Sequence, residues 1–144
     1  MEGSRRERVL FSLQLAVGGA MGTLARHLVT QHMPPPSSVD PRYPFATMLI
    51  NLAGSAILGF IVANAEARGR GKGWVWPMLG VGFCGGFTTF SAVVHEWVLL
   101  MRDRQVGLAS IYLTVSFVGG ALVALLAGAL AVHLARRGPG RRRA

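Results

Sequence analysis

Polar side chains recur at four-residue intervals inside the apolar parts of this sequence. Thr47, Asn51 and Ser55 fall on one face of a helix. Further along, a second polar track with the same spacing consists of Tyr112, Ser116 and Gly120. Polar groups inside hydrocarbon are costly, so such tracks often have a function. They could equally hold helices together, because Ser, Thr and Asn often bond across helix contacts in membranes.

A second chemical signal is the segment GFCGGFTTFS (residues 82–91). Its paired glycines and paired threonines are poor helix formers and lie in the middle of an apolar stretch. A helix broken there would free backbone carbonyls, which membranes tolerate only where they are buried or bind an ion. Broken helices of this kind form ion sites in transporters. The alternative is a glycine stretch that is merely flexible.

Enzymatic chemistry has no support in the sequence. It lacks the HExxH, CxxC, Walker and Gly-x-Ser-x-Gly patterns, and no two carboxylates are spaced for acid–base work. Cys84 is the only cysteine, so no internal disulfide can form. Gly18 and Gly22, like Gly82 and Gly86, form GxxxG pairs that allow helices to approach closely.

The elements that must position these groups are membrane helices. Of 144 residues, 51% are hydrophobic and only 15% are charged, against about 25% in soluble domains. Four apolar stretches, at about 9–31, 45–65, 74–101 and 106–134, are each long enough to span a bilayer. We predict an all-α integral membrane protein with one four-helix domain over residues 1–135 and a basic tail over residues 136–144. Five prolines break the chain between the first two spans.

The net charge of +9 is concentrated at the ends and in one loop, which disfavours nucleic-acid binding and predicts contact with lipid headgroups. Eleven of the fifteen basic residues fall on one side of a four-span chain: Arg5, Arg6, Arg8, Arg68, Arg70, Lys72, Arg136, Arg137, Arg141, Arg142 and Arg143. Arg26 lies late in the first span. This bias predicts that both termini are cytoplasmic in a multi-pass protein of the plasma membrane.

The sequence resembles the Fluc (CrcB-type) fluoride channels of bacteria. The matching segments are GGAMGTLARH (residues 18–27), PFATMLINLAGSAILGF (44–60), GFCGGFTTFS (82–91) and the spacing of Tyr112, Ser116 and Gly120. The resemblance covers all four spans. It implies an antiparallel dimer of inverted subunits, a third helix broken in mid-membrane, two fluoride pores and a structural sodium ion at the dimer centre.

The resemblance also implies roles for individual residues. Asn51 would donate to fluoride, and Phe90 would present its ring edge to the anion. Tyr112 and Ser116 would continue the fluoride pathway. The remaining assignments are the Gly85 and Thr88 backbone carbonyls as sodium ligands, Arg26 at the vestibule and Glu96 at the family's acidic position.

One position departs from the family pattern. The family usually reads TTFSxF, but Val93 stands here where the second phenylalanine is expected. Phe87 could compensate only if its ring faces the pore. A homodimer of inverted copies should also have little charge bias. Both observations favour a heterodimer with an oppositely oriented paralogue over a homodimer.

Two other functions remain open. A four-span multidrug or cation exporter needs a carboxylate within the membrane, and the first span contains none. A non-conducting assembly subunit would use the GxxxG pairs for packing alone. The function that the resemblance implies is passive, fluoride-selective export that lowers cytoplasmic fluoride.

Overall fold

The computed structural model describes residues 2–33, 43–69 and 73–137, and within them all regular structure is helical. The segments are α1 (Glu2–His32), α2 (Phe45–Ala67), the π-helical η1 (Trp76–Phe83), α3 (Cys84–Phe87), α4 (Phe90–Arg102), α5 (Val106–Thr114), the π-helical η2 (Val115–Gly119) and α6 (Gly120–Arg137). The proline-rich connection from Pro34 to Pro41 and the tail beyond Arg137 lie outside the described residues.

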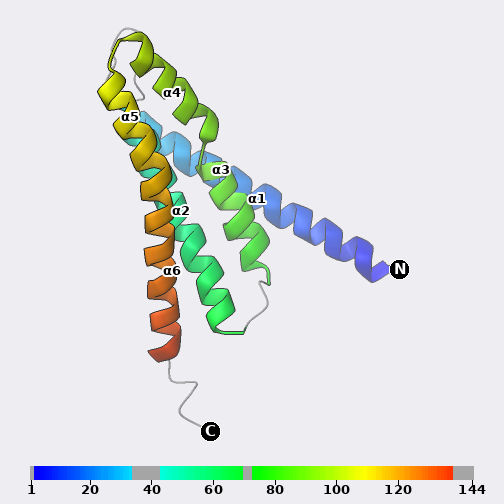
Figure 1. Ribbon diagram of the computed structural model, residues 1–144. Coiled ribbons are helices and arrows are strands. Elements are labelled where there is room, and N and C mark those ends of the chain that lie inside the picture. Colours follow the sequence, from blue (N-terminus) through cyan, green and yellow to red (C-terminus); the bar gives the residue numbers. More distant parts are fainter. Residues whose placement is uncertain (1, 34–42, 70–72, 138–144) are drawn as a thin grey trace.

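Four helical stretches of the described chain, the third of them interrupted at Thr88 and Thr89, are long and apolar enough to cross a membrane. They are Arg5–His32, Phe45–Ala67, Trp76–Arg102 and Val106–Arg137. The prediction of an all-helical chain with four helices long and apolar enough to span a membrane is therefore confirmed for the described residues. The helices extend past the predicted apolar limits because arginine and glutamate are good helix formers at their ends. The N-terminal half of α1 projects away from the other helices (Figure 1), and its Leu10 and Phe11 are exposed.

Glycines set the distance between α1 and the third span. A β-carbon on Gly18 would overlap the carbonyl of Met78, and one on Gly22 would overlap the carbonyl of Phe83. From the opposite side, a β-carbon on Gly86 would overlap the carbonyl of Gly19. The two GxxxG pairs therefore face each other across a backbone-to-backbone contact, the close approach for which small residues are used in membranes.

We expect Gly22→Ala to destabilise the fold by about 2 kcal/mol, because the new methyl would meet Phe83 and Phe87 backbone atoms that cannot rotate away. Gly107→Ala is the matched control, since a β-carbon there would meet nothing within 4 Å. The control should unfold at the parental temperature or slightly above it. Thermal unfolding in detergent compares the two variants, and equal midpoints would contradict the tight contact.

A small buried cluster joins α4 to α5. Val93, Leu100, Ala109 and Tyr112 are its buried members. Tyr112 has no exposed surface, and Val93 is 3% exposed. On the other side of the bundle α2 packs along α6, where a β-carbon on Gly59 would overlap the Ala124 backbone. These contacts fix how the polar residues of α2, α4 and α5 face one another.

Candidate functional site

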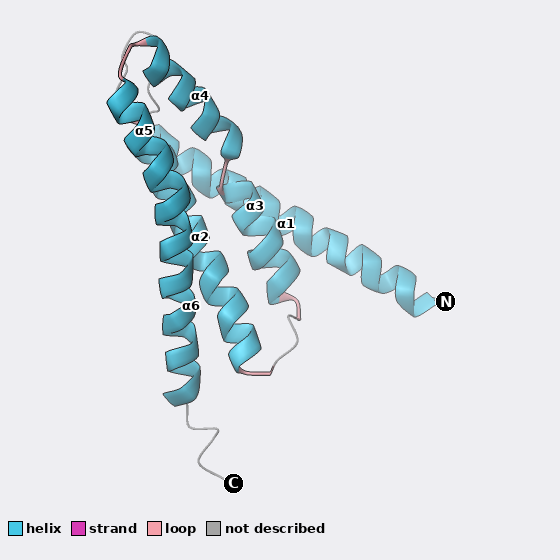
Figure 2. Ribbon diagram, in the orientation of Figure 1, coloured by secondary structure: helices cyan, strands magenta, loops and turns pink. Residues whose placement is uncertain are grey.

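The backbone leaves the helical conformation between α3 and α4. Thr88 has ψ 159° and Thr89 has φ −149° and ψ 125°, both extended values. The segment appears as a short loop between the two helices (Figure 2). Such an interruption exposes backbone groups that need partners, because hydrocarbon offers none.

The two threonines cap the adjoining helix ends. The Thr88 backbone N–H and its Oγ1 both donate to the carbonyl of Cys84, at 2.9 and 2.8 Å. The Thr89 Oγ1 accepts a hydrogen bond from the Ala92 backbone N–H at 3.3 Å, as a helix N-cap does. The threonine pair thus ends one helix and begins the next.

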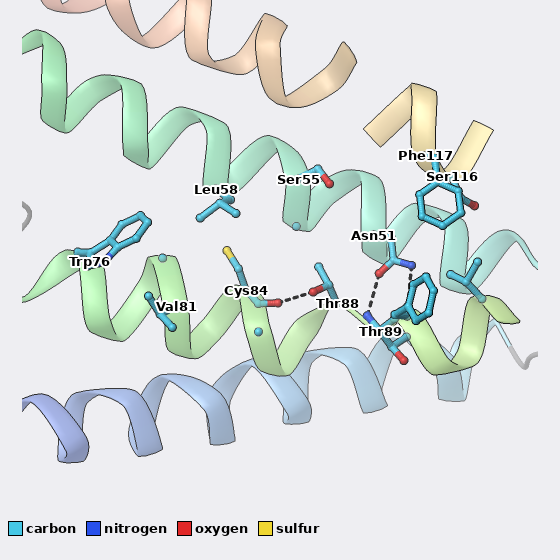
Figure 3. Close-up of a pocket in the computed structure, with 15 residues that line it drawn as sticks. Asn51, Ser55, Leu58, Trp76, Val81, Cys84, Thr88, Thr89, Ser116 and Phe117 are labelled. Carbon is cyan, nitrogen blue, oxygen red and sulfur yellow. Dashed lines mark hydrogen bonds between the residues drawn. The ribbon is translucent and has the colours of Figure 1, made fainter. Parts of the chain in front are cut away.

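Asn51 of α2 satisfies the backbone of Thr89. Its Nδ2 donates to the Thr89 carbonyl at 3.0 Å, and its Oδ1 accepts from the Thr89 N–H at 2.8 Å (Figure 3). The amide therefore replaces both hydrogen bonds that a neighbouring backbone would make. One of the two Nδ2 hydrogens is used in this way, which leaves the second for another acceptor.

The same contact affects Gly85. In an uninterrupted α-helix the Thr89 N–H would donate to the Gly85 carbonyl. Here that N–H donates to Asn51 instead. A β-carbon on Gly85 would meet nothing within 4 Å, so the residue lies open on the surface of this chain. Backbone carbonyls are ligands that hard cations accept, and the donor chemistry therefore fits a sodium ion.

A cavity of about 500 Å³ lies between α2, the third span and η2. It brings together six residues singled out from the sequence: Asn51, Gly85, Thr88, Phe90, Val93 and Ser116 (Figure 3). Ser55 also lines it, so the polar track of α2 faces the track of the fourth span. The Ser116 Oγ is buried and has no hydrogen-bond partner among the described residues. The lining residues include no charged side chain.

Tyr112 lies elsewhere and forms a second polar cluster. Its hydroxyl donates to Glu96 Oε2 at 2.6 Å, and the Thr47 hydroxyl donates to Glu96 Oε1 at 2.6 Å. Glu96 is only 2% exposed. The structure buries the family's acidic position between α2 and α5. Tyr112 is not among the lining residues of the 500 Å³ cavity.

A second cavity of about 580 Å³ opens between α1, α2 and α4. Half-buried Arg26 lines it, together with His27, His95 and Glu96. Thr89 lines both cavities, so the extended segment stands where the two approach each other. Among the described residues, no group of three His, Cys, Asp or Glu side chains is placed to hold a metal ion.

Phe90 lines the 500 Å³ cavity, whereas Phe87 is buried elsewhere. Phe87, the candidate substitute for a ring at position 93, is 8% exposed and stacks on Phe83 with ring centroids 5.4 Å apart. It does not line the 500 Å³ cavity, but Phe117 does. Sequence reasoning missed Phe117. The only signal was its place beside Ser116.

Comparison with known proteins identifies the family of the chain. Residues 13–129 match the family model described as CrcB-like protein, Camphor Resistance (CrcB). A Fluoride-specific ion channel FluC from Chlorobium luteolum is 42% identical over 127 residues, which is 83% of this chain and 89% of the relative. One from Chlorobium phaeobacteroides is 37% identical, covering 81% and 88%. Fluoride-specific ion channel FluC 1 from Geobacillus kaustophilus is 35% identical, covering 79% and 91%.

Proposed function

The chain belongs to the CrcB-like family, and from this we propose that it is a fluoride-selective channel that passively exports fluoride and lowers its cytoplasmic concentration. The observation that carries the proposal is the uncharged cavity lined by Asn51, Ser116 and Phe90. It offers an anion amide, hydroxyl and ring-edge contacts. Its hydroxyl at Ser116 has no partner within the described chain.

The energetics explain why several weak donors are needed. Taking a small anion from water into a medium of low dielectric costs about 20 kcal/mol by an idealised Born estimate. A hydrogen bond to a charged group contributes only about 1.5–3 kcal/mol net. Several hydroxyl and amide donors, with retained water, are therefore required. A lysine or arginine in the cavity would bind the anion so strongly that its release would be slow, and conduction requires release.

The membrane potential can drive export without a chemical energy source. One charge crossing 100 mV gains about 2.3 kcal/mol, and an interior that is negative expels an anion. Fluoride that enters as neutral hydrofluoric acid dissociates inside and leaves as the ion. In this proposal the protein is a multi-pass protein of the bacterial plasma membrane with both termini in the cytoplasm.

A second, inverted subunit would complete the assembly. Gly85 is exposed in the single chain, and its carbonyl lacks the donor that a continuous helix would supply. The carbonyls of Gly85 and Thr88 would hold sodium together with the equivalent groups of the second subunit. The ion would supply a fixed positive charge where the broken helices meet. The charge bias favours a paralogue as that subunit, since one sequence with such a bias inserts in one direction.

Efflux from liposomes tests the proposal. We expect fluoride-loaded liposomes containing this chain and an oppositely oriented paralogue from the same genome to release fluoride, as read by a fluoride-selective electrode. Chloride-loaded liposomes, read by a chloride-selective electrode, should release far less. Liposomes with the chain alone should release little. Rapid release from the lone chain would contradict the requirement for a paralogue. No release from either preparation would contradict the proposed channel function.

A further inference from the structure

Two largely exposed phenylalanines meet at the cavity. Phe90 begins α4 and is 67% exposed, while Phe117 lies in η2 and is 54% exposed. Their ring centroids are 6.1 Å apart and the rings are inclined by 60°. This separation lies within the range of interacting aromatic pairs. Among the described residues, these are the only phenylalanines that line the 500 Å³ cavity.

Among the described residues no other phenylalanine lines this cavity, and Trp76, the remaining aromatic residue of its lining, lies at the opposite end from Phe117 (Figure 3). Val93 has no ring, and it is held in the buried cluster with Leu100 and Tyr112. Phe83 and Phe87 stack on each other where α1 packs on the third span. Enlarging Val93 would overfill a packed cluster. The ring pair of this cavity is therefore built across two spans, from α4 and η2.

The neighbourhood of Phe117 connects this pair to the hydrogen-bond donors. Ser116 precedes Phe117 in the same π-helical turn, and its buried Oγ has no partner in the described chain. Buried hydroxyls without partners are uncommon and call for an explanation. Short π-helical segments occur frequently at functional sites. Here one such turn brings a donor hydroxyl and an aromatic ring to the same cavity.

We infer that Phe117 is a specificity-determining residue of the fluoride pathway and forms with Phe90 the ring pair that the anion passes. The inference rests on the proposed function. The edge of a phenylalanine ring carries partial positive charge, so it attracts a small anion without binding it as a cation would. Two rings fixed against each other also keep the passage narrow. The pair is complete within one chain, so the valine at position 93 does not leave this pathway without a second ring.

Flux measurements on matched variants test the inference. Phe117→Leu keeps the apolar volume but removes the polarised ring edge, whereas Phe117→Tyr keeps the ring. Phe11→Leu is the control, because Phe11 is an exposed phenylalanine on α1 outside both cavities. Each is reconstituted with whichever second subunit the unmodified chain needs for conduction. Fluoride and chloride efflux are then recorded.

We expect Phe117→Leu to lower fluoride flux about tenfold if both pores of the dimer contain the ring pair. If only one pore contains it, the loss is about twofold, because the other pore continues to conduct. Phe117→Tyr should retain most of the flux, and Phe11→Leu should match the unmodified protein. If the role of Phe117 were only structural, Phe117→Leu would unfold at a lower temperature. Any bulky apolar residue at this position would then restore both stability and flux. Phe117→Met, measured in parallel, should remain impaired while unfolding at the parental temperature.

The outcomes separate this inference from the function on which it rests. If the unmodified protein conducts fluoride and both Phe117→Leu and Phe117→Met conduct it equally well, the role of Phe117 is overturned. The proposed channel function then still stands. Parental flux in Phe117→Met with impaired flux in Phe117→Leu also overturns the role of the ring, because the volume of an apolar side chain would then be enough for conduction. Absence of fluoride flux in the unmodified protein, with and without its second subunit, overturns both the inference and the proposed channel.

Discussion

Asn51→Asp should reduce fluoride flux by a hundredfold or more. The substitution places a carboxylate beside the cavity where an amide donor stands now. Two like charges about 4 Å apart repel by about 4 kcal/mol at an effective dielectric constant of 20. That repulsion alone corresponds to roughly a thousandfold change in occupancy. Efflux of fluoride from liposomes measures the loss.

The same helix offers a matched control. Asn64 lies on α2 outside both cavities, and its Oδ1 accepts a hydrogen bond from the Arg68 Nε at 2.8 Å. Asn64→Asp introduces the same negative charge at a position where an arginine is already a partner, and flux should stay at the parental level. Equal flux in the two variants would show that the anion does not pass near Asn51.

Asn51→Asp also removes the donor to the Thr89 carbonyl. A buried acceptor without a partner costs about 1–3 kcal/mol, so the variant should also unfold at a lower temperature. The two effects are separable because fluoride flux is recorded well below the unfolding transition. Loss of flux at a temperature where the variant remains folded assigns the effect to charge.

Glu96→Ala should destabilise the fold by about 3 kcal/mol. Truncation leaves the hydroxyls of Thr47 and Tyr112 without their acceptor and opens a void in a fully buried position. Each orphaned group costs about 1–3 kcal/mol, and the void adds to that cost. Thermal unfolding in detergent measures the loss.

Glu96→Gln is the control for volume and hydrogen bonding. Glutamine keeps one acceptor oxygen, and a hydroxyl can accept as well as donate, so Tyr112 and Thr47 can rearrange around the amide. This variant should lose less than about 1 kcal/mol. Equal destabilisation by the two substitutions would indicate that the charge of Glu96, not its hydrogen bonds, stabilises the cluster.

The four spans could be predicted from composition because a membrane helix needs little more than an apolar run of sufficient length. Close helix contacts were also predictable, since Gly18, Gly22, Gly82 and Gly86 form two GxxxG pairs. The structure adds that these two pairs face each other. The spacing of Asn51 from Ser55 placed both on one face, and the structure brings that face to the cavity.

The pairing of Glu96 with Tyr112 and Thr47 could not be derived in the same way. It depends on which faces of α2, α4 and α5 meet, and a helix that is apolar all round carries no periodic signal of its packing face. The same reason hid Phe117. Phe117 lies in the π-helical segment η2, and nothing in the local sequence VSFVG marks such a turn.

The two hydrogen bonds between Asn51 and Thr89 fasten α2 to the start of α4. An exporter that works by alternating access rocks one group of helices against another, and here that movement would have to break both bonds together. Helices held together by these hydrogen bonds are suited to conduction through a pore, which requires no cycle of conformational change. In the proposed channel the anion would therefore follow a fixed route, with no alternating movement of the helices.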